Sequence, residues 1–216
     1  MITIAIDGPG GAGKSTIAKL VAKRLDIDYI DTGAMYRAIA YKTVNENIDT
    51  NDDKSIRTML DDTEIDFIGG SIYLDGQCVD KQIRTPEISQ MASKVSALGP
   101  VREKLVELQR KMGHEKSVIM DGRDIGTNVL TDAAYKFFMT ASAEERAQRR
   151  YKELIEKGES VTFEQVLSDI NQRDKNDMER ELNPLRKAED ATEIDTTGLS
   201  IEEVADVILK NIVSEK

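Results

Sequence analysis

Residues 8–15 constrain the fold of this chain more than any other stretch. They match the pattern G-x-x-x-x-G-K-[ST], the P-loop, and read Gly8-Pro9-Gly10-Gly11-Ala12-Gly13-Lys14-Ser15. The glycines let the backbone wrap an anion with its N–H groups pointing inward. Lys14 can then reach the β- and γ-phosphates of a nucleoside triphosphate, and the Ser15 hydroxyl can coordinate Mg²⁺. We expect residues 8–15 and the adjoining Thr16 to bind the triphosphate.

The sequence on both sides of the loop fits this interpretation. Residues 2–6 form a short apolar run rich in β-branched side chains, which is typical of a strand. Ile17, Val21 and Leu25 recur on one face of a helix after the loop. That helix would begin at Gly13–Lys14, so its N-terminal N–H groups also face the phosphates. The alternative is a glycine-rich turn that Lys and Ser follow by chance, and such a turn would need neither a strand before it nor a helix after it.

Composition narrows the class of protein. The chain has 216 residues, of which 39% are hydrophobic and 32% charged, as expected of one α/β domain with a small insert. It contains no apolar run of the ~18 residues that a transmembrane helix needs, and it opens on a strand rather than a signal sequence, so we expect a cytoplasmic protein without membrane association. A single cysteine and a single histidine exclude an intrachain disulfide, a Cys-based zinc site and chemistry on histidine pairs.

The net charge of −10 argues against binding to nucleic acid, which requires a basic face. An enzyme that binds anionic nucleotides at this net charge must concentrate its arginines locally. The sequence contains such clusters, described below.

The order of predicted elements indicates a parallel sheet covered by helices on both faces. A strand, the P-loop helix, a second strand at 28–31 and a second helix at 34–47 come first. Further elements are expected in this order: a helix at 51–60, strands at 117–120 and 135–139, helices at 142–156 and 162–183, a strand at 193–196 and a last helix from residue 200. We predict a single domain with its core at about 1–60 and 115–216.

Residues 64–80 interrupt this alternation. Three short strands separated by Gly69-Gly70 and Asp75-Gly76 predict a β-meander with two-residue turns. Because so small a sheet does not stand alone, we expect an insert at about 61–112 that carries part of a binding site. The alternative is a surface decoration.

A P-loop predicts triphosphate binding but not a reaction. A switch GTPase needs an N-K-x-D motif, and the nearest match, residues 171–174, lacks the lysine and lies within a predicted helix. A molecular machine usually needs a longer chain and a partner-facing surface. A small-molecule kinase needs a second anion site and a mobile cover.

The stretch Asp31-Thr32-Gly33-Ala34-Met35-Tyr36-Arg37 is the first candidate for the second anion site. It follows the second strand at the sheet edge where α/β folds bind ligands. Thr32 lies at a helix N-terminus and Arg37 projects about one turn later, a combination that suits a monophosphate. The alternative is an ordinary capping threonine and a surface arginine.

At this point the sequence resembles a known family. Ile6-Asp7-Gly8-Pro9 with the P-loop, residues 31–37, and Asp121-Gly122-Arg123-Asp124-Ile125-Gly126-Thr127 are similar to bacterial cytidylate kinases, and the resemblance spans the whole chain including the meander. It implies a P-loop kinase fold with an insert that binds the nucleoside monophosphate (NMP) and a lid at about 146–165. It also implies ATP-dependent phosphorylation of CMP and dCMP with Mg²⁺.

The resemblance assigns the pyrimidine to Ser93, Arg102 and Asp124. Ser93 and Arg102 lie on either side of a turn at Gly99-Pro100, so they could converge. A hydroxyl, a guanidinium and a carboxylate together could read the carbonyl, ring nitrogen and amine of cytosine. The alternative is a capping residue and a solvated arginine.

The predicted helix at 162–182 carries charge at inward positions. Its buried stripe includes Val166 and Ile170, and continuing the same phase gives Arg173, Asp177 and Arg180. Charged groups there are costly in a core but suitable beside an anion. The resemblance assigns Arg173 and Asp177 to the ribose and Arg180 to the acceptor phosphate. The alternative is an Arg–Asp ladder on a solvated helix end.

Arg146, Arg149 and Arg150 form a further set on one helical face, before a turn at residues 157–160. In the family this region is the lid, and the resemblance implies that its arginines approach the phosphates when it closes. Which of them touches a phosphate is left open. The alternative is salt bridging along the helix, for instance between Glu145 and Arg149.

The predicted mechanism needs no general base, because the acceptor is already an anionic phosphate oxygen. Catalysis then consists of positioning and charge neutralisation. The groups expected to hold the phosphates are Lys14, Mg²⁺ on Ser15 and Asp121, and the arginines Arg37, Arg123 and Arg180, with the lid arginines added on closure. Alternatives are a kinase for UMP or a non-nucleotide acid, and an ATP-binding protein without turnover. We expect a monomer.

Overall fold

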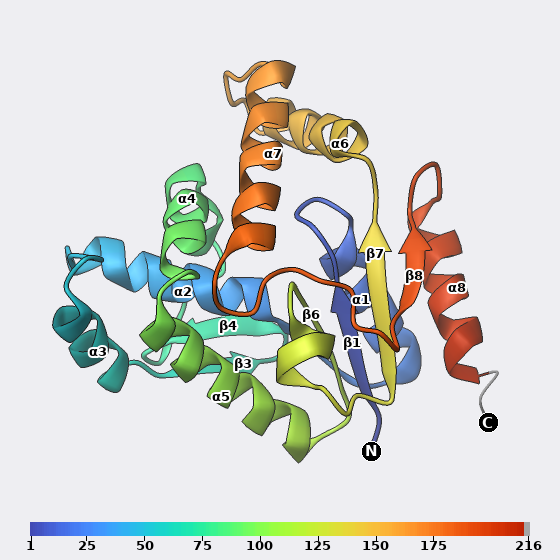
Figure 1. Ribbon diagram of the computed structural model, residues 1–216, viewed down its shortest axis with the longest axis horizontal. Coiled ribbons are helices and arrows are strands. Elements are labelled where there is room, and N and C mark those ends of the chain that lie inside the picture. Colours follow the sequence, from blue (N-terminus) through green and yellow to red (C-terminus); the bar gives the residue numbers. More distant parts are fainter. Residues whose placement is uncertain (214–216) are drawn as a thin grey trace. The chain divides into compact units, whose positions relative to one another are not determined.

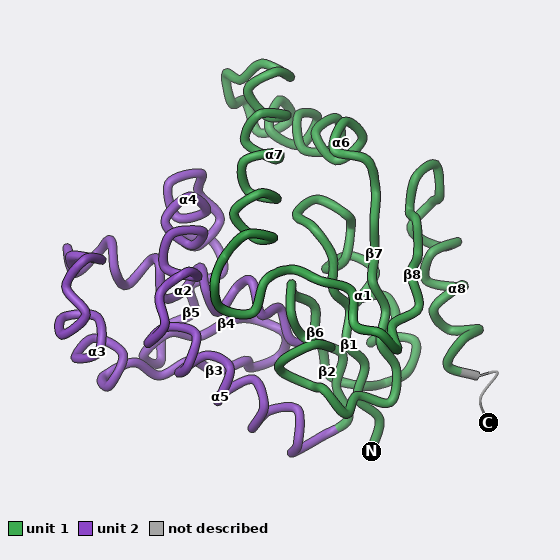
Figure 2. The backbone as a smooth tube through the Cα atoms, viewed as in Figure 1, with its two compact units in different colours: residues 1–29, 117–216 green, residues 30–116 purple. Residues whose placement is uncertain are grey.

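The computed structural model describes residues 1–213, which form two compact units. The first unit comprises residues 1–29 and the chain from Ser117 onward, and the second comprises Ile30–Lys116 (Figure 2). Among the residues 1–213, no helix has the length and apolar content that crossing a membrane requires.

A five-stranded sheet has the order β2-β6-β1-β7-β8 (Figure 1). Its strands are β1 (Thr3–Asp7), β2 (Asp28–Asp31), β6 (Val118–Gly122), β7 (Tyr135–Thr140) and β8 (Thr192–Asp195). Four of its strands lie in the first unit, and the edge strand β2 spans the division between the units at residues 29 and 30. β1 lies in the middle and pairs in parallel with β6 and β7, so that Ile4 is opposite Ile119 and Tyr135. The predicted parallel sheet is confirmed.

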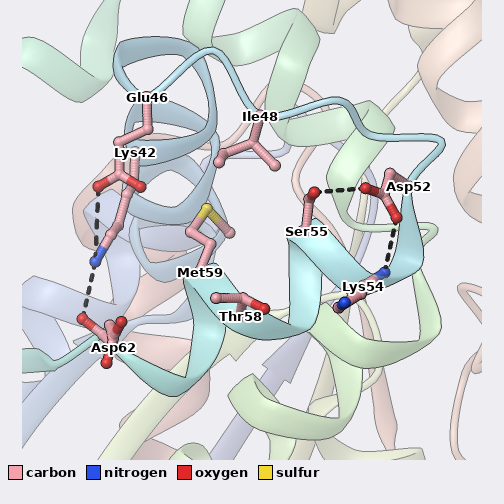
Figure 3. A pocket seen from close by; sticks show the side chains of 9 residues that line it. All are labelled: Lys42, Glu46, Ile48, Asp52, Lys54, Ser55, Thr58, Met59 and Asp62. Carbon is pink, nitrogen blue, oxygen red and sulfur yellow. Dashed lines mark hydrogen bonds and ion pairs between the residues drawn. The ribbon is translucent and has the colours of Figure 1, made fainter.

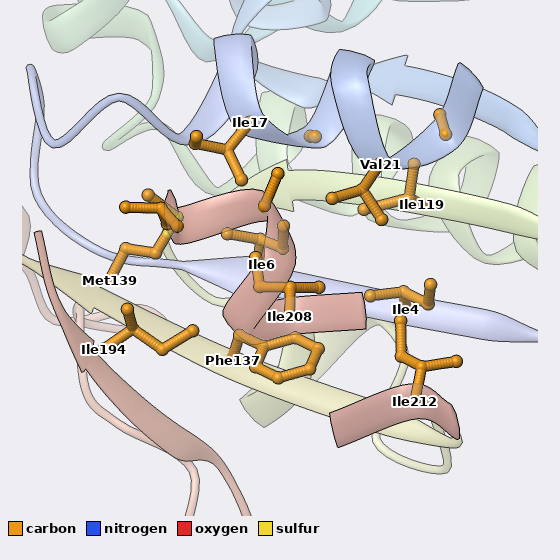
Figure 4. Packing of buried hydrophobic residues seen from close by; sticks show 14 of the residues in the cluster. Ile4, Ile6, Ile17, Val21, Ile119, Phe137, Met139, Ile194, Ile208 and Ile212 are labelled. Atoms are coloured by element: carbon orange, nitrogen blue, oxygen red, sulfur yellow. The ribbon is translucent and has the colours of Figure 1, made fainter. Parts of the chain in front are cut away.

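Helices α1 (Lys14–Leu25) and α8 (Ile201–Val213) pack on one face of this sheet. Ile4 and Ile6 of β1 and Phe137 of β7 point into the same apolar cluster as Val21 and Ile208 from the two helices (Figure 4). Successive side chains of a strand point to opposite faces. The alternation therefore sends Ala5 and Asp7 to the face away from this cluster, a point that matters below.

Helices α6 (Ala143–Glu156) and α7 (Phe163–Glu179) form a hairpin with its own small core. The rings of Tyr151 and Phe163 meet edge to face with centroids 6.3 Å apart. Thr162 and Gln165 form a reciprocal capping box at the start of α7.

The expectation that α7 continues to residue 183 is wrong. The helix ends at Glu179, and Arg180 has extended backbone angles (φ −58°, ψ 141°). The chain then turns back so that the Leu185 N–H donates to the Asp177 carbonyl (2.8 Å). Pro184 follows Asn183, whose φ is +50°, and a residue before proline is disfavoured in the right-handed helical region.

The second unit contains four α-helices and a three-stranded antiparallel sheet in the order β3-β4-β5. Its elements are α2 (Thr32–Asn45), α3 (Asp53–Asp61), β3 (Ile65–Ile68), β4 (Ser71–Leu74), β5 (Gln77–Cys78), a 3-10 turn at Gln82–Arg84, α4 (Pro86–Val95) and α5 (Gly99–Glu115).

The turns of this sheet explain its register and confirm the predicted meander. Gly69 (φ +61°) and Gly70 (φ +83°) occupy the first, and Asp75 (φ +50°) and Gly76 (φ +77°) the second. Positive φ at both central residues is the requirement of the type I′ turn, which matches the twist of adjacent strands. The buried Lys42 of α2 joins the second turn to α2, donating to the Asp75 carboxylate at 2.7 Å.

Candidate active site

The P-loop leaves the carboxyl end of β1 and leads directly into α1. A Cβ on Gly8 would lie 2.1 Å from the Met139 carbonyl oxygen of β7, and Gly8 has a φ of +145°, so only glycine fits there. Gly13 precedes α1 in the left-handed region (φ +86°). Lys14 is 5% exposed, and its Nζ donates to the Pro9 carbonyl at 2.8 Å. The loop therefore closes around the lysine amino group.

The environment of Lys14 disfavours its charge in the absence of phosphate. Burial, followed by the nearby Arg123 guanidinium, lowers the pKa of Lys14 to about 7, against the opposing carboxylates of Asp121 and Asp7. A bound phosphate would favour the charged form, because an adjacent opposite charge raises the pKa of an amine. A bound phosphate would thus stabilise the ammonium group better than the loop does by itself.

Ser15 and Asp121, both assigned to Mg²⁺ in the sequence analysis, meet beside the loop. The Ser15 hydroxyl donates to Asp121 Oδ2 at 2.8 Å, and the Tyr29 hydroxyl donates to Oδ1 at 2.7 Å. Tyr29 was not among the predicted residues. These oxygen donors suit Mg²⁺, which takes few protein ligands beside phosphate oxygens and water. Within residues 1–213, no group of three or more His, Cys, Asp or Glu side chains is arranged to hold a metal.

Arg146 is held against the P-loop by three partners. Its guanidinium donates to the Gly10 carbonyl at 2.9 Å and to the Ala141 carbonyl at 3.0 Å. It also pairs with both carboxylate oxygens of Asp174, at 3.1 and 2.5 Å. Arg146 is 4% exposed. The pair therefore joins α6, α7 and the loop within the first unit.

Asp174 was not among the predicted residues, and Arg173 does not face inward as expected. Arg173 is exposed, whereas the side chains of Asp174 and Asp177 are each only 14% exposed. The inward stripe of α7 steps from Ile170 by four residues to Asp174 rather than by three to Arg173. Because steps of three and four both keep a residue on one helical face, the spacing allowed either choice.

Asp177 holds Arg123, which follows β6. The Arg123 Nε donates to Asp177 Oδ2 at 2.8 Å. Burial alone would lower the pKa of Arg123, but the Asp177 carboxylate, with Asp121 and Asp174, raises it above the usual range. Burial would raise the pKa of Asp177, yet Arg123 and then Arg180 keep it below the usual range. Both groups therefore remain charged. They lie beside the P-loop, because a Cβ on Gly10 would be 3.3 Å from Arg123 Nη2.

Arg180 reaches the same region although it lies outside the helix. Its Nη2 donates to Asp124 Oδ1 at 2.9 Å and its Nε to the Asn183 carbonyl at 2.8 Å. The Arg180 and Asp124 side chains are 8% and 7% exposed. Arg180 lies beyond the last residue of α7, so the expectation that helical phase directs it inward was wrong. The turn after α7 directs this side chain inward instead.

The three arginines of α6 do not act as one set. Arg146 lies at the loop, as described above. Arg149 pairs with Glu145 and donates to the Thr196 carbonyl at 3.1 Å, near Gly13. Arg150 pairs with Glu153 on its own helix at 3.1 Å. The salt bridging along the helix that was considered as an alternative is therefore present for Arg149 and Arg150.

In the second unit, Asp31 caps α2. Its Oδ1 accepts from the Ala34 N–H at 2.8 Å, and its Oδ2 pairs with Arg37 Nη2 at 3.0 Å. Thr32, considered above as a capping residue, is instead the buried first residue of the helix. A Cβ on Gly33 would lie 3.1 Å from Arg37 Nη1, so the glycine leaves room for the guanidinium over the helix N-terminus.

Ser93 and Arg102 lie near the α4–α5 corner of the second unit. Arg102 is 2% exposed, donates to the Ser96 carbonyl at 3.3 Å and stacks over the Tyr36 ring at 5.7 Å. The Ser93 carbonyl accepts from the Ser96 hydroxyl at 2.9 Å. Both predicted residues are thus tied to Ser96. Tyr36, within the 31–37 motif, was not singled out.

A separate cavity of about 510 Å³ lies in the second unit between α2 and α3 (Figure 3). Charged side chains, including Lys42, Glu46, Asp52 and Lys54, line it together with the apolar Ile48 and Met59 and three further polar residues. None of the predicted site residues is part of its wall. Its side chains bond chiefly to one another, as in the contacts of Asp52 with Ser55 and with the Lys54 N–H.

Comparison with known proteins identifies the family. A sequence model described as cytidylate kinase matches residues 4–214. The chain is 53% identical over 211 residues to "Cytidylate kinase" of Clostridioides difficile (strain 630), covering 98% of each chain. It is 51% identical over 215 residues to "Cytidylate kinase" of Bacillus subtilis (strain 168), covering 98% of this chain and 96% of the relative.

Solved structures agree on the fold. Shikimate kinase from Acinetobacter baumannii in complex with shikimate matches with a TM-score of 0.51 and 18% identity, covering 100% of this chain and 95% of that one. Shikimate kinase from Bacteroides thetaiotaomicron matches with a TM-score of 0.52 and 12% identity, covering 99% and 98%. These likenesses establish the P-loop kinase fold. With the family match over nearly its whole length, the chain belongs to the cytidylate kinase family.

Proposed function

We propose that this protein transfers the γ-phosphoryl group of ATP to CMP or dCMP, giving CDP or dCDP and ADP. The observation that carries the proposal is the gathering of arginines on the P-loop of the first unit. Arg146 bonds the Gly10 carbonyl, and the Arg123 guanidinium lies against Gly10. In a chain with a net charge of −10, two arginines thus lie at the loop where a triphosphate would bind.

The donor phosphates are proposed to lie on the N–H groups of residues 8–16, with Lys14 on the β- and γ-phosphates. Ser15 and Asp121 would hold Mg²⁺, which supplies charge neutralisation to the phosphates when it is bound. Tyr29 orients the Asp121 carboxylate by its hydrogen bond at 2.7 Å. Arg146 is placed to neutralise charge at the loop if its pairing with Asp174 gives way to phosphate.

The groups proposed to bind the acceptor are given for each unit by itself. In the first unit, Arg123 and Arg180 are assigned to the acceptor phosphate, Asp177 and Arg173 to the ribose, and Asp124 to the base. In the second unit, Arg37 and Thr32 are assigned to the phosphate, and Ser93 and Arg102 to the base. The Asp177, Asp124 and Asp31 carboxylates pair with Arg123, Arg180 and Arg37, and phosphate oxygens would replace them as partners on binding.

The chemistry requires no proton abstraction by the protein. The attacking oxygen of a monophosphate is already anionic, so the protein contributes alignment and stabilisation of charge on the transferred group. Exclusion of water by α6 and α7 would strengthen the same interactions and limit hydrolysis of ATP.

A coupled assay of ADP release with Mg²⁺ tests the proposal across CMP, dCMP, UMP, AMP, GMP and shikimate. We expect turnover with CMP and dCMP well above that with the other acceptors, and little ADP without an acceptor. ATP hydrolysis that does not depend on CMP, or no turnover at all, would refute the main proposal. Preference for UMP or shikimate would favour a kinase for another acceptor. Analytical ultracentrifugation tests the expectation of a monomer.

A further inference from the structure

One buried carboxylate near the P-loop has no part in the proposed mechanism. Asp7 is the last residue of β1, immediately before Gly8, and it is 4% exposed. Strand alternation directs it away from the apolar cluster that holds Ile6. A buried acidic side chain requires compensating hydrogen bonds. Its partners therefore indicate its role.

The partners of Asp7 are two backbone N–H groups of the segment that follows β6. Oδ1 accepts from the Ile125 N–H and Oδ2 from the Gly126 N–H, each at 2.7 Å. These are the first two residues of a short π-helical turn, η2 (Ile125–Val129). Two short bonds from one planar carboxylate to adjacent N–H groups fix both the position and the direction of that backbone.

The turn does not use its own capping residue. Asp124 precedes it, and its side chain makes no capping hydrogen bond there. Instead the Asp124 carboxylate accepts from Arg180 Nη2 at 2.9 Å and from Asn128 Nδ2 at 3.1 Å. Asp7 performs the capping from the neighbouring strand. The Asp124 carboxylate is thereby left to face Arg180.

The surroundings leave this contact little freedom. A Cβ on Gly126 would lie 3.3 Å from Asp7 Oδ2 and 3.2 Å from Lys136 Cδ, so glycine allows the carboxylate to approach the backbone closely. Burial raises the pKa of Asp7 to about 6, even though both backbone hydrogen bonds act to lower it. The protein retains a carboxylate at a site that disfavours its charge.

We propose that Asp7 is a positioning residue that aligns Arg123 and Asp124 with the P-loop by holding the backbone at Ile125 and Gly126. This inference rests on the proposed function, because it assigns Arg123 and Asp124 to the acceptor. Asp7 lies one residue before the donor loop, and its carboxylate fixes the segment that carries acceptor groups. It thus couples the placement of the two within the first unit.

The test compares Asp7→Asn with wild type. An amide has one acceptor oxygen, and its NH₂ group would face the second N–H, so one hydrogen bond is lost while the volume is kept. We expect kcat/KM for CMP to fall about 10- to 100-fold, as a displacement of about 1 Å in a phosphoryl-transfer site can cause. The Kd for ATP, measured by titration without acceptor, should change less than about twofold.

A second variant perturbs the same contact from its other side. Gly126→Ala places a methyl group against Asp7 Oδ2. It should lower kcat/KM for CMP by less than Asp7→Asn does, and it should likewise leave the Kd for ATP nearly unchanged. Asp52→Asn is the matched control: the Asp52 carboxylate also accepts a backbone N–H, that of Lys54 at 3.1 Å, but at the exposed start of α3. It should lower stability alone. If Asp7→Asn does not fold, Gly126→Ala decides.

Three results would overturn the inference. Wild-type kcat/KM for CMP in both variants would show that Asp7 is merely structural. Equal losses of ATP and CMP affinity would place its effect on the P-loop rather than on Arg123 and Asp124. Crystal structures of the variants separate this inference from the proposed function. An unmoved segment 123–126 contradicts it whatever the wild-type activity, whereas a wild-type protein without CMP-dependent turnover contradicts the proposed function alone.

Discussion

Replacement of Arg180 by alanine tests the arrangement of charges in the first unit. Arg180 and Asp124 are both more than nine-tenths buried, and their charged groups are 2.9 Å apart. Removing one partner of a buried ion pair typically costs about 3–5 kcal/mol, because the remaining charge keeps its desolvation penalty without its partner. Asp124 retains the hydrogen bond from Asn128 at 3.1 Å. We therefore expect a loss near the lower end, about 3 kcal/mol.

Urea unfolding followed by circular dichroism measures this loss, and Arg186→Ala is its control. Arg186 is exposed, so the control removes the same charge without breaking a buried pair. It should change the free energy of unfolding by less than about 0.5 kcal/mol. A loss below about 1 kcal/mol for Arg180→Ala would refute the reasoning from the buried pair.

The same variant tests the assignment of Arg180 to the acceptor. Loss of one donor to a developing phosphoryl charge should lower kcat by about 10²- to 10³-fold in the coupled assay. Because Arg180 bonds Asp124 and Asn183, its loss should leave the position of Lys14 and the affinity for ATP unchanged. If ATP affinity collapsed while kcat survived, Arg180 would belong to the donor site.

Three further predictions follow from the first unit. Lys14→Ala should lower kcat by at least ~10²-fold if the ammonium meets transition-state charge, and near-normal turnover in the coupled assay would contradict that role. Asp174→Ala leaves the buried Arg146 without its carboxylate and should cost about 2–4 kcal/mol in urea unfolding, whereas the exposed Asp169→Ala should cost little. Asp7 has a folded pKa of about 6 against a usual 3.8, so the stabilisation from its proton is complete below pH 4 and lost as the pH rises through 6. Relative to Asp7→Asn, wild type should gain up to about 3 kcal/mol on acidification from pH 7 to 4, and parallel pH profiles of unfolding would show that the pKa of Asp7 is not raised.

Much of the fold was predictable because its signals are local. The P-loop pattern, the type I′ turns at Gly69-Gly70 and Asp75-Gly76 and the capping box at Thr162 each depend on residues within a few positions of one another. Backbone conformation and capping are set at that range, so sequence spacing is sufficient to predict them. The family resemblance extended this to the residues expected in the site.

The contacts within the site were not predictable in the same way. Helical spacing could not distinguish Arg173 from Asp174, and the choice depends on Arg146 arriving from another helix. The inward position of Arg180 arises from the turn after α7. The sequence spacing had placed Arg180 within a longer helix and so did not predict this turn.

The sequence by itself determined that a phosphate-binding loop joins a strand to a helix, since Gly8, Gly13 and Lys14 specify that geometry through their own backbone and charge. Only the tertiary structure decided which carboxylate each arginine meets and that Asp7 caps a turn 118 residues away. An ion pair forms between whichever charged groups packing brings within about 4 Å, and packing of strands and helices depends on the whole chain. For this reason the loop could be predicted from eight residues, whereas the ion pairs around it could not.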